Sequence, residues 1–235
     1  MKKKFDVVYL VKNALFNEEL RYSLRSVEEN FEFNKVWFYG GRPLGLVPDE
    51  YVRCSQGENS KWANTTKMLF KVCRNEDITE DFWLFNDDFF ILKPFTLEHN
   101  VTNGTLEDRI KEIEGARGGN GSRYTANLKI AKQLLEEKGL PTKNYAVHIP
   151  MLVNRRKALE ALTMFPECPM FRSLYGNYVD EPTIERLDVK KRFITEEISE
   201  EEDLVSTEDK TFQIGQAGEF IRDRFRSSSR YEHRN

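Results

Sequence analysis

The regular alternation of short apolar runs with amphipathic segments constrains the fold of this chain more than any other feature. The runs FDVVYLV (5–11) and KVWFYGG (35–41) are rich in β-branched and aromatic residues, which is typical of strands covered on both faces. Between them, the segment 17–31 places leucine and valine at helical spacing behind Asn17, a residue type favoured at the N-cap position. This part of the chain therefore predicts a β-α-β unit.

The same alternation continues further along the chain. A short strand is expected near 51–54, a helix over 58–75, and another strand in the run DFWLFNDDFF (81–90). Successive strands that are joined by helices form parallel sheets, because each connection must cross over the sheet. The sequence thus predicts an α/β fold that is Rossmann-like, with a mostly parallel sheet and helices on both faces.

The middle of the chain is expected to hold a helical insertion at about 103–142 within a single domain, 1–235. Two helical patterns flank the glycine-rich stretch GARGGNG (115–121). These glycines could cradle a phosphate, but they match no P-loop and follow no strand, so a hinge or flexible loop is the favoured interpretation. Downstream, the sequence predicts a strand at 145–150 and helices at 155–167 and 216–225.

Composition excludes several classes of protein. Hydrophobic residues make up 39% of the chain and charged residues 32%, which indicates a globular protein, and the net charge of −3 argues against a general nucleic-acid-binding surface. No apolar run is long enough to span a membrane and the basic start turns polar too early for a secretory signal, so we expect a cytoplasmic protein. Cys54, Cys73 and Cys168 form no CxxC pair and are expected to be reduced core thiols.

Charge is concentrated in two blocks near the C-terminus. The segment TEEISEEED (195–203) is acidic, and the tail 222–235 carries five arginines. One interpretation is a solvated acidic loop followed by a frayed basic tail. The other is that the tail arginines help to hold a phosphate-bearing ligand or a polyanionic acceptor.

Two adjacent acids, Asp87 and Asp88, interrupt the aromatic run EDFWLFNDDFFILKP (80–94). Ligands of open α/β sheets bind beyond the carboxyl ends of the strands, where these acids are expected to lie. Adjacent carboxylates in a partly dry site stay ionised only beside a compensating cation, and Mg²⁺ or Mn²⁺ would bind both carboxylates and substrate phosphates. A solvated turn is the alternative, which the flanking Phe89 and Phe90 disfavour. The pair therefore predicts a metal site.

Three further side chains are candidates for the same site. Arg21 and Arg25 lie on one face of the predicted helix and could grip phosphate oxygens, although pairing with surface glutamates is an equal alternative. His148 is the one histidine inside an apolar strand pattern, and it is followed closely by a proline. A histidine there could accept a proton from an attacking hydroxyl or contact a phosphate, although a structural role is common.

Several of these segments occur in the order that is seen in the Stealth proteins, the hexose-1-phosphate transferases of capsule synthesis and lysosomal-enzyme tagging. FDVVY resembles the first conserved region of that family, ELRYSLRSVE with FNDDFF…KP resembles the second, and HIP…FPE resembles the third. The similarity covers about 5–95 and 145–167. The chain departs from the family at 10–13, which reads LVKN instead of a Thr-Trp-Val stretch, and shows no clear fourth region.

The resemblance implies a nucleotide-sugar donor, a divalent metal and a core related to GT-A-like glycosyltransferases. We therefore expect a metal-dependent transferase that moves a sugar or a sugar 1-phosphate to an acceptor hydroxyl, on a polysaccharide or on a modified nucleic acid such as DNA. A non-catalytic module of the same fold, binding a sugar nucleotide or a protein, is the alternative. The expected catalytic residues are Asp88, His148 and Arg25, the donor-binding residues Asp6, Arg21, Asn64 and Asp87, and the metal ligands Asp87 and Asp88.

Overall fold

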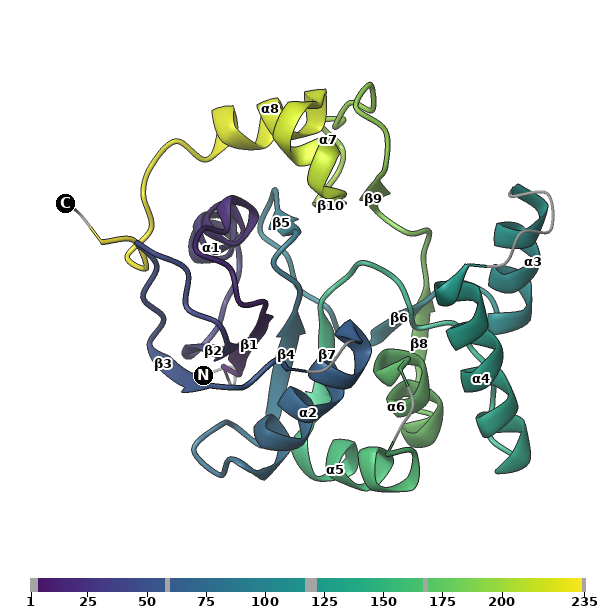
Figure 1. Ribbon diagram of the computed structural model, residues 1–235. Helices are drawn as coiled ribbons and strands as arrows, with labels where there is room; N and C mark the ends of the chain where they lie inside the picture. Colours follow the sequence, from purple (N-terminus) through teal and green to yellow (C-terminus); the bar gives the residue numbers. More distant parts are fainter. Residues whose placement is uncertain (1–3, 58–59, 117–121, 167–168, 234–235) are drawn as a thin grey trace.

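A five-stranded sheet forms the centre of the protein (Figure 1). The computed structural model describes residues 4–57, 60–116, 122–166 and 169–233. The strand order is β3-β2-β1-β4-β7; the first four strands are mutually parallel and β7 runs antiparallel to β4. The predicted α/β class with a mostly parallel sheet is therefore confirmed. The strands are β1 (Asp6–Val11), β2 (Val36–Gly40), β3 (Glu50–Arg53), β4 (Asp81–Phe85) and β7 (Met151–Asn154).

Helices cover both faces of this sheet. Side chains alternate along a strand, so Val7 and Tyr9 of β1 face one layer and Val8 faces the other. The first layer contains α1, whose Leu20 and Leu24 are fully buried against the sheet. The second layer contains α2, α5 and α6. The bounds are α1 (Glu18–Asn30), α2 (Lys61–Arg74), α5 (Arg155–Met164) and α6 (Phe171–Val179).

The parallel pairing of β1 with β4 brings two strand ends to one edge of the sheet. Asp6 pairs with Phe82 and Tyr9 pairs with Phe85, so both strands leave the sheet at the same level. The segment after β1 leads into the N-terminus of α1, and the segment after β4 contains the two adjacent aspartates. This edge is therefore lined by loop residues and by the first turn of a helix.

The predicted strand in the run 81–90 does end at the acids, and the residues after them form a second strand. The run divides at Asn86–Asp88 into β4 and β5 (Phe89–Ile91), which belong to different sheets. The two aromatic residues after the break face different clusters. The Phe89 ring lies 6.1 Å from that of Phe85 in the cluster of the central sheet, and the Phe90 ring stacks on Phe212 with centroids 5.5 Å apart. The second sheet has the order β5-β10-β9, with β9 (Lys190–Lys191) and β10 (Leu204–Thr207).

The region of the predicted insertion contains the two expected helices. They are α3 (Leu106–Ala116) and α4 (Arg123–Glu137), and they lie to one side of the central sheet (Figure 1). Their apolar faces pack with residues from α5 and α6 in a separate hydrophobic cluster. Most of the glycine-rich stretch lies outside the described residues. A two-stranded sheet next to these helices pairs β6 (Asn100–Thr102) with β8 (Thr183–Glu185).

The C-terminal arginines are bonded to the protein, so the expectation of a frayed tail is wrong for the described part. After α7 (Asp209–Ile214) and α8 (Gln216–Arg224), the chain runs back beside α1 (Figure 1). Arg222 donates to the carbonyl oxygen of Phe212, Arg224 donates to that of Leu92, and Tyr231 is 2% exposed. The hydrogen bonds of Arg222 and Arg224 therefore go to backbone carbonyl oxygens of the protein. Arg234 lies outside the described residues.

Two smaller expectations concern membrane spans and thiols. Of the helices in the described ranges, none is long and apolar enough to cross a membrane. Cys54 and Cys73 are free and buried, as expected for core thiols, and burial raises the pKa of both. Cys168 lies outside the described residues.

An ion pair between α1 and the C-terminal segment generates a first prediction. Both carboxylate oxygens of Glu232 accept hydrogen bonds from Arg25, each at 2.7 Å, and the two side chains are 10% and 11% exposed. Glu232→Ala would leave the Arg25 guanidinium buried without its counter-ion, so it should lower the free energy of unfolding in urea by about 3 kcal/mol. Glu50→Ala, which removes an exposed pair with Lys35, should cost much less. Equal losses in the two variants would contradict this account.

Candidate functional site

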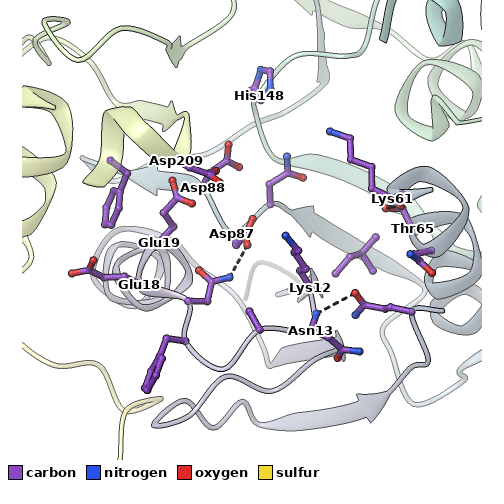
Figure 2. A pocket seen from close by; sticks show the side chains of 18 of the residues that line it. Lys12, Asn13, Glu18, Glu19, Lys61, Thr65, Asp87, Asp88, His148 and Asp209 are labelled. Carbon is purple, nitrogen blue, oxygen red and sulfur yellow. Dashed lines mark hydrogen bonds between the residues drawn. The ribbon is translucent and has the colours of Figure 1, made fainter. Parts of the chain in front are cut away.

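A pocket of about 790 Å³ opens at the sheet edge where β1 and β4 end (Figure 2). Its walls come from the loop after β1, the first turn of α1, the turn after β4 and the N-terminal half of α2. Ligands of open α/β sheets bind in this position. We call this cavity the donor pocket, after the donor-binding role that the sequence predicts for residues in its wall.

Asp87 is tied to the start of α1 by one asparagine. Asn17 caps the helix by accepting a hydrogen bond from the backbone N–H of Leu20 at 2.9 Å, and its side-chain amide donates to Asp87 Oδ2 at 2.7 Å. The predicted N-cap is therefore confirmed, and it has a second function. Because the same side chain fixes the helix start and the acid, the two strand ends are held in a defined relative position.

Asp88 is anchored by the second sheet. Its Oδ2 atom accepts hydrogen bonds from Lys190 Nζ at 2.7 Å and from Ser206 Oγ at 2.8 Å. Lys190 belongs to β9 and Ser206 to β10, so both partners are more than 100 residues away in the sequence. Asp88 is 9% exposed. The turn after β4 thus carries one acid held by an ammonium group and one held by a neutral amide.

Negative charge is crowded at this point of the pocket. Figure 2 shows Glu19 and Asp209 gathered beside the two adjacent aspartates. Burial raises the pKa of Glu19 to about 8, and the charges of Asp87, Asp88 and Asp209 add to the effect, while a hydrogen bond from Thr207 opposes it. Burial, followed by the charge of Asp88, also raises the pKa of Asp87. Such crowding indicates a place where a cation would be stabilised.

The carboxylates suit a metal that is shared with a ligand better than one held by protein alone. Within the described ranges, no three histidine, cysteine, aspartate or glutamate side chains converge closely enough to hold a metal ion. Mg²⁺ in phosphate-handling sites is commonly bound by one or two carboxylates, with water and substrate phosphates completing its shell. Asp87 and Asp88 fit that mode of binding. The pKa of Glu19 is raised first by burial and then by the neighbouring carboxylates, and a cation would offset the charge of those carboxylates.

His148 reaches the pocket by a different route from the one the sequence suggested. The expected strand 145–150 is absent; the segment is irregular, and the strand is β7, which begins at Met151. Since β7 runs antiparallel to β4, its starting end lies at the same edge as the carboxyl end of β4. His148 therefore lines the donor pocket from the beginning of a strand instead of the end of one.

The imidazole of His148 is oriented by Asp188. Its Nδ1 atom lies 3.0 Å from both carboxylate oxygens, and the backbone N–H of His148 donates to the same carboxylate at 3.0 Å. Burial alone would raise the pKa of Asp188, but the bonds from His148 and the charge of Arg192 outweigh it and hold that pKa well below its usual range. In the described structure no protein group bonds Nε2, so this nitrogen is the one available to accept a proton.

Asn64 and Asp6 differ in their placement. Asn64 lines the donor pocket from α2, as expected for a donor-binding residue. Asp6 lies at the opposite end of β1, where its carboxylate accepts hydrogen bonds from Asn34, Trp37 and the backbone of Thr79. It is 1% exposed. Because Asp6 begins the strand whose other end forms the pocket, the structure gives it a role in holding the sheet and not in binding the donor.

Arg21 and Arg25 do not line the donor pocket. Both face the C-terminal segment, where Glu232 binds Arg25 closely and lies 3.6 Å from the Nε atom of Arg21. Arg25 also donates to the carbonyl oxygen of Phe225. The predicted shared helix face is correct, but it lies away from the pocket. Arg25 is largely covered by the C-terminal segment, and Arg21, whose side chain is 38% exposed, lies beside Glu232, so the structure does not support the phosphate-binding role.

Sequence reasoning missed four residues that build the site. Asn17 and Glu19 lie at the start of the helix predicted after the first strand, and that position was a usable signal for the pocket edge. Asp188 and Lys190 stand in a stretch without periodicity, so no local pattern indicated their partners.

The raised pKa of Glu19 generates a prediction about pH. The folded protein keeps a proton on this carboxyl group up to about pH 8, whereas the unfolded chain releases it near the ordinary value of 4.5. Its contribution to stability is therefore complete below about pH 4.5 and is lost as the pH rises to 8. Between pH 5 and pH 8, the free energy of unfolding measured in urea should fall on the order of 2 kcal/mol more in the wild type than in Glu19→Gln.

Glu18→Gln is the matched control, because its side chain is the exposed neighbour on the same helical turn. It should keep the wild-type slope of stability against pH. A Glu19→Gln variant with that same slope would contradict the assignment of the proton to Glu19.

No protein-family model matches this chain, and no curated protein matches it. Function is therefore inferred from the residues and geometry of the pocket.

Proposed function

We propose that this protein is a metal-dependent transferase that uses a nucleotide-diphosphate sugar and delivers the sugar, or its 1-phosphate, to an acceptor hydroxyl. The observation that carries the proposal is the pair Asp87 and Asp88, which lies in a pocket at the carboxyl edge of a mostly parallel sheet. The parallel strands followed by antiparallel β7 agree with the GT-A-like core that the sequence resemblance implies.

The charges of the donor pocket argue for a cation that enters with an anionic ligand. Five acidic and three lysine side chains line the pocket, and Lys190 is already bound to Asp88. A diphosphate alone would meet net repulsion there. Mg²⁺ or Mn²⁺ held by Asp87 and Asp88 would offset that repulsion and neutralise the charge developing on the leaving group.

Lys12 is a second candidate contact for the diphosphate. It follows β1, is exposed, and among the described residues its amine has no acidic partner. Figure 2 shows its side chain extending into the pocket, with the amine near Asp87 in this view. A ligand bound at this point would therefore meet a cationic group and a carboxylate together. Asn64, on the α2 wall, is placed to contact the same ligand.

His148 is placed to serve as the general base. The acceptor oxygen would form a bond to C1 of the sugar as the bond from C1 to the diphosphate oxygen breaks, and the nucleoside diphosphate would leave. In the other reaction the oxygen bonds to the phosphorus that carries the sugar as the bond from that phosphorus to the bridging oxygen of the diphosphate breaks, and the nucleoside monophosphate leaves. In both reactions the hydroxyl proton passes to Nε2 of His148, and the Asp188 carboxylate stabilises the resulting imidazolium.

A non-catalytic module that binds a sugar nucleotide is the second candidate. The observation that favours it is the saturation of Asp88 Oδ2, which already accepts bonds from Lys190 and Ser206. Both candidates predict binding of the sugar nucleotide, and only the first predicts its consumption. Measurement of released nucleotide separates them, and its identity as the diphosphate or the monophosphate tells which bond breaks.

Binding of donor and metal is tested by thermal unfolding. UDP-sugars with Mn²⁺ should stabilise the wild type by about 2.7 kcal/mol at one hundred times the dissociation constant, and either component alone should do much less. Asp87→Asn removes a carboxylate and relieves repulsion. It should therefore unfold at a higher temperature than the wild type without ligand, and should lose most of the metal-dependent increment.

Asp77→Asn is the matched control, since Asp77 is exposed at the opposite end of β4. It should keep the full metal-dependent increment. The proposal fails if Asp87→Asn and Asp88→Asn both respond to Mn²⁺ and UDP-sugar as the wild type does.

The role of the His148–Asp188 pair is tested by kinetics. His148→Gln removes the proton acceptor, and Asp188→Asn removes the group that orients it, so each should lower kcat by about 10²-fold. The thermal shift with UDP-sugar and Mn²⁺ should stay unchanged, because neither side chain is assigned to donor binding. Asp180→Asn, which removes a surface ion pair with Lys143, should keep the wild-type kcat. A rise in KM for the donor at constant kcat would assign the pair to binding instead.

A further inference from the structure

A second cavity adjoins the donor pocket on the far side of His148. Its volume is about 640 Å³, and it shares Lys61, Asn86, His148 and Lys190 with the donor pocket. The rest of its wall includes α3 and Tyr124 of α4, the two helices of the insertion. We call this cavity the side pocket. The shared histidine means that a ligand in each pocket could approach the same imidazole.

The two pockets differ in the sign of their charge. Acidic side chains outnumber basic ones in the donor pocket, whereas the side pocket is lined by five cationic side chains and two carboxylates. An anionic ligand would therefore be attracted to the side pocket without a metal. The cationic residues are Lys61, Arg109, Arg172, Lys190 and Arg192, and the acidic ones are Glu112 and Glu208.

Three of these cations are already paired with carboxylates. Arg109 binds Glu112, Lys190 binds Asp88, and Arg192 binds Asp188. Those groups hold the fold together and leave little net charge for a ligand. The positive character of the pocket thus comes from the remaining two, Arg172 and Lys61.

Arg172 is held by carbonyl oxygens and not by an acid. Its Nη1 donates to Ile149 O at 2.6 Å, and its Nη2 donates to Leu84 O at 3.2 Å and lies 3.4 Å from Asn86 Oδ1. A guanidinium has five N–H donors, so these three bonds do not use all of them. Burial lowers the pKa of Arg172 to about 10, which still leaves it charged at neutral pH. The described residues supply no carboxylate that binds this cation.

Lys61 is the second uncompensated cation. It is the first residue of α2, its amine lies 5.0 Å from the centre of the Trp62 ring, and no carboxylate of the described residues binds it. Figure 2 shows the side chain extending from α2 into the cavity. Lys61 lines both pockets, so its ammonium stands at their junction.

We propose that the side pocket binds the acceptor, and that the acceptor is a sugar bearing a phosphate or carboxylate group that lies against Arg172 and Lys61. This assignment rests on the proposed transferase function. It places the acceptor hydroxyl next to His148, which lines both pockets. Charge-assisted hydrogen bonds from a guanidinium and an ammonium would fix the orientation of such a group.

A sugar fits this pocket better than a nucleic acid does. Two cations that bind no carboxylate of the described residues, in one cavity, match a single anionic group. A nucleic acid would be bound by a row of contacts to successive phosphates, and the protein carries a net charge of −3 with its C-terminal arginines bonded to protein atoms.

The test measures binding of small probes to protein saturated with UDP and Mn²⁺, so that a phosphate cannot occupy the donor pocket. Glucose 6-phosphate and inorganic phosphate should bind at least about tenfold more tightly than glucose. Lys61→Ala should lower the affinity for glucose 6-phosphate by about tenfold, as expected for loss of one charge-assisted hydrogen bond. Lys71→Ala, an exposed lysine on the same helix, should leave it unchanged. Arg172→Lys, which keeps the charge and loses the planar group, gives a second variant.

Equal affinity for glucose 6-phosphate in Lys61→Ala and Lys71→Ala would overturn the proposal. So would tighter binding of a duplex carrying hydroxymethylated bases than of glucose 6-phosphate. Failure of the transferase proposal is read separately, from the response to UDP and Mn²⁺ alone. If that response is missing, glucose 6-phosphate can still bind in a way that depends on Lys61 and not on Asp87. That result would show that the side pocket binds an anionic sugar but has no role in transfer.

Discussion

Everything at the candidate site depends on the parallel pairing of β1 with β2 on one side and β4 on the other. The three strands are buried on both faces, so a shift in register would move apolar side chains out of the two hydrophobic layers. With the register fixed, polar groups can collect only where the strands end. Asn17 then links the two ends by bonding Asp87 and capping α1 with the same side chain. The position of the acids is thus a consequence of core packing far from them.

Local patterns in the sequence carry enough information for the layered core and for the aspartate pair. The strands β1, β2 and β4 and the helices α1 and α2 are encoded by short-range periodicity, and Asn17 by the chemistry of a helix start. The same information fails where a partner decides the role of a side chain. Helical spacing places Arg21 and Arg25 on one face, but it cannot say that Glu232, some 200 residues later, covers that face.

The second sheet could not be predicted for a related reason. The strand β9 has two residues, too few for any alternation to be visible, yet Lys190 within it supplies the counter-ion of Asp88. The residues after the acids divide between two hydrophobic clusters. Phe89 and Ile91 pack with the central sheet, whereas Phe90 stacks on Phe212 of α7, and only the tertiary structure shows this division. His148 reached the expected edge because β7 is antiparallel, although the predicted strand was wrong.

A proton on Glu19 and a cation beside the two aspartates would compete, because the same negative charges favour both. Without a cation, the Lys190 ammonium serves Asp88, and the remaining excess of negative charge is reduced by the proton that Glu19 retains. A divalent cation beside Asp87 and Asp88 would lower the pKa of Glu19 and release that proton, and the released carboxylate would in turn strengthen binding of the cation. The pocket would therefore stay close to neutral in both states. The proton on Glu19 lowers the repulsion among these carboxylates in the empty pocket, and under the proposed function a metal that enters with its diphosphate would take over that role.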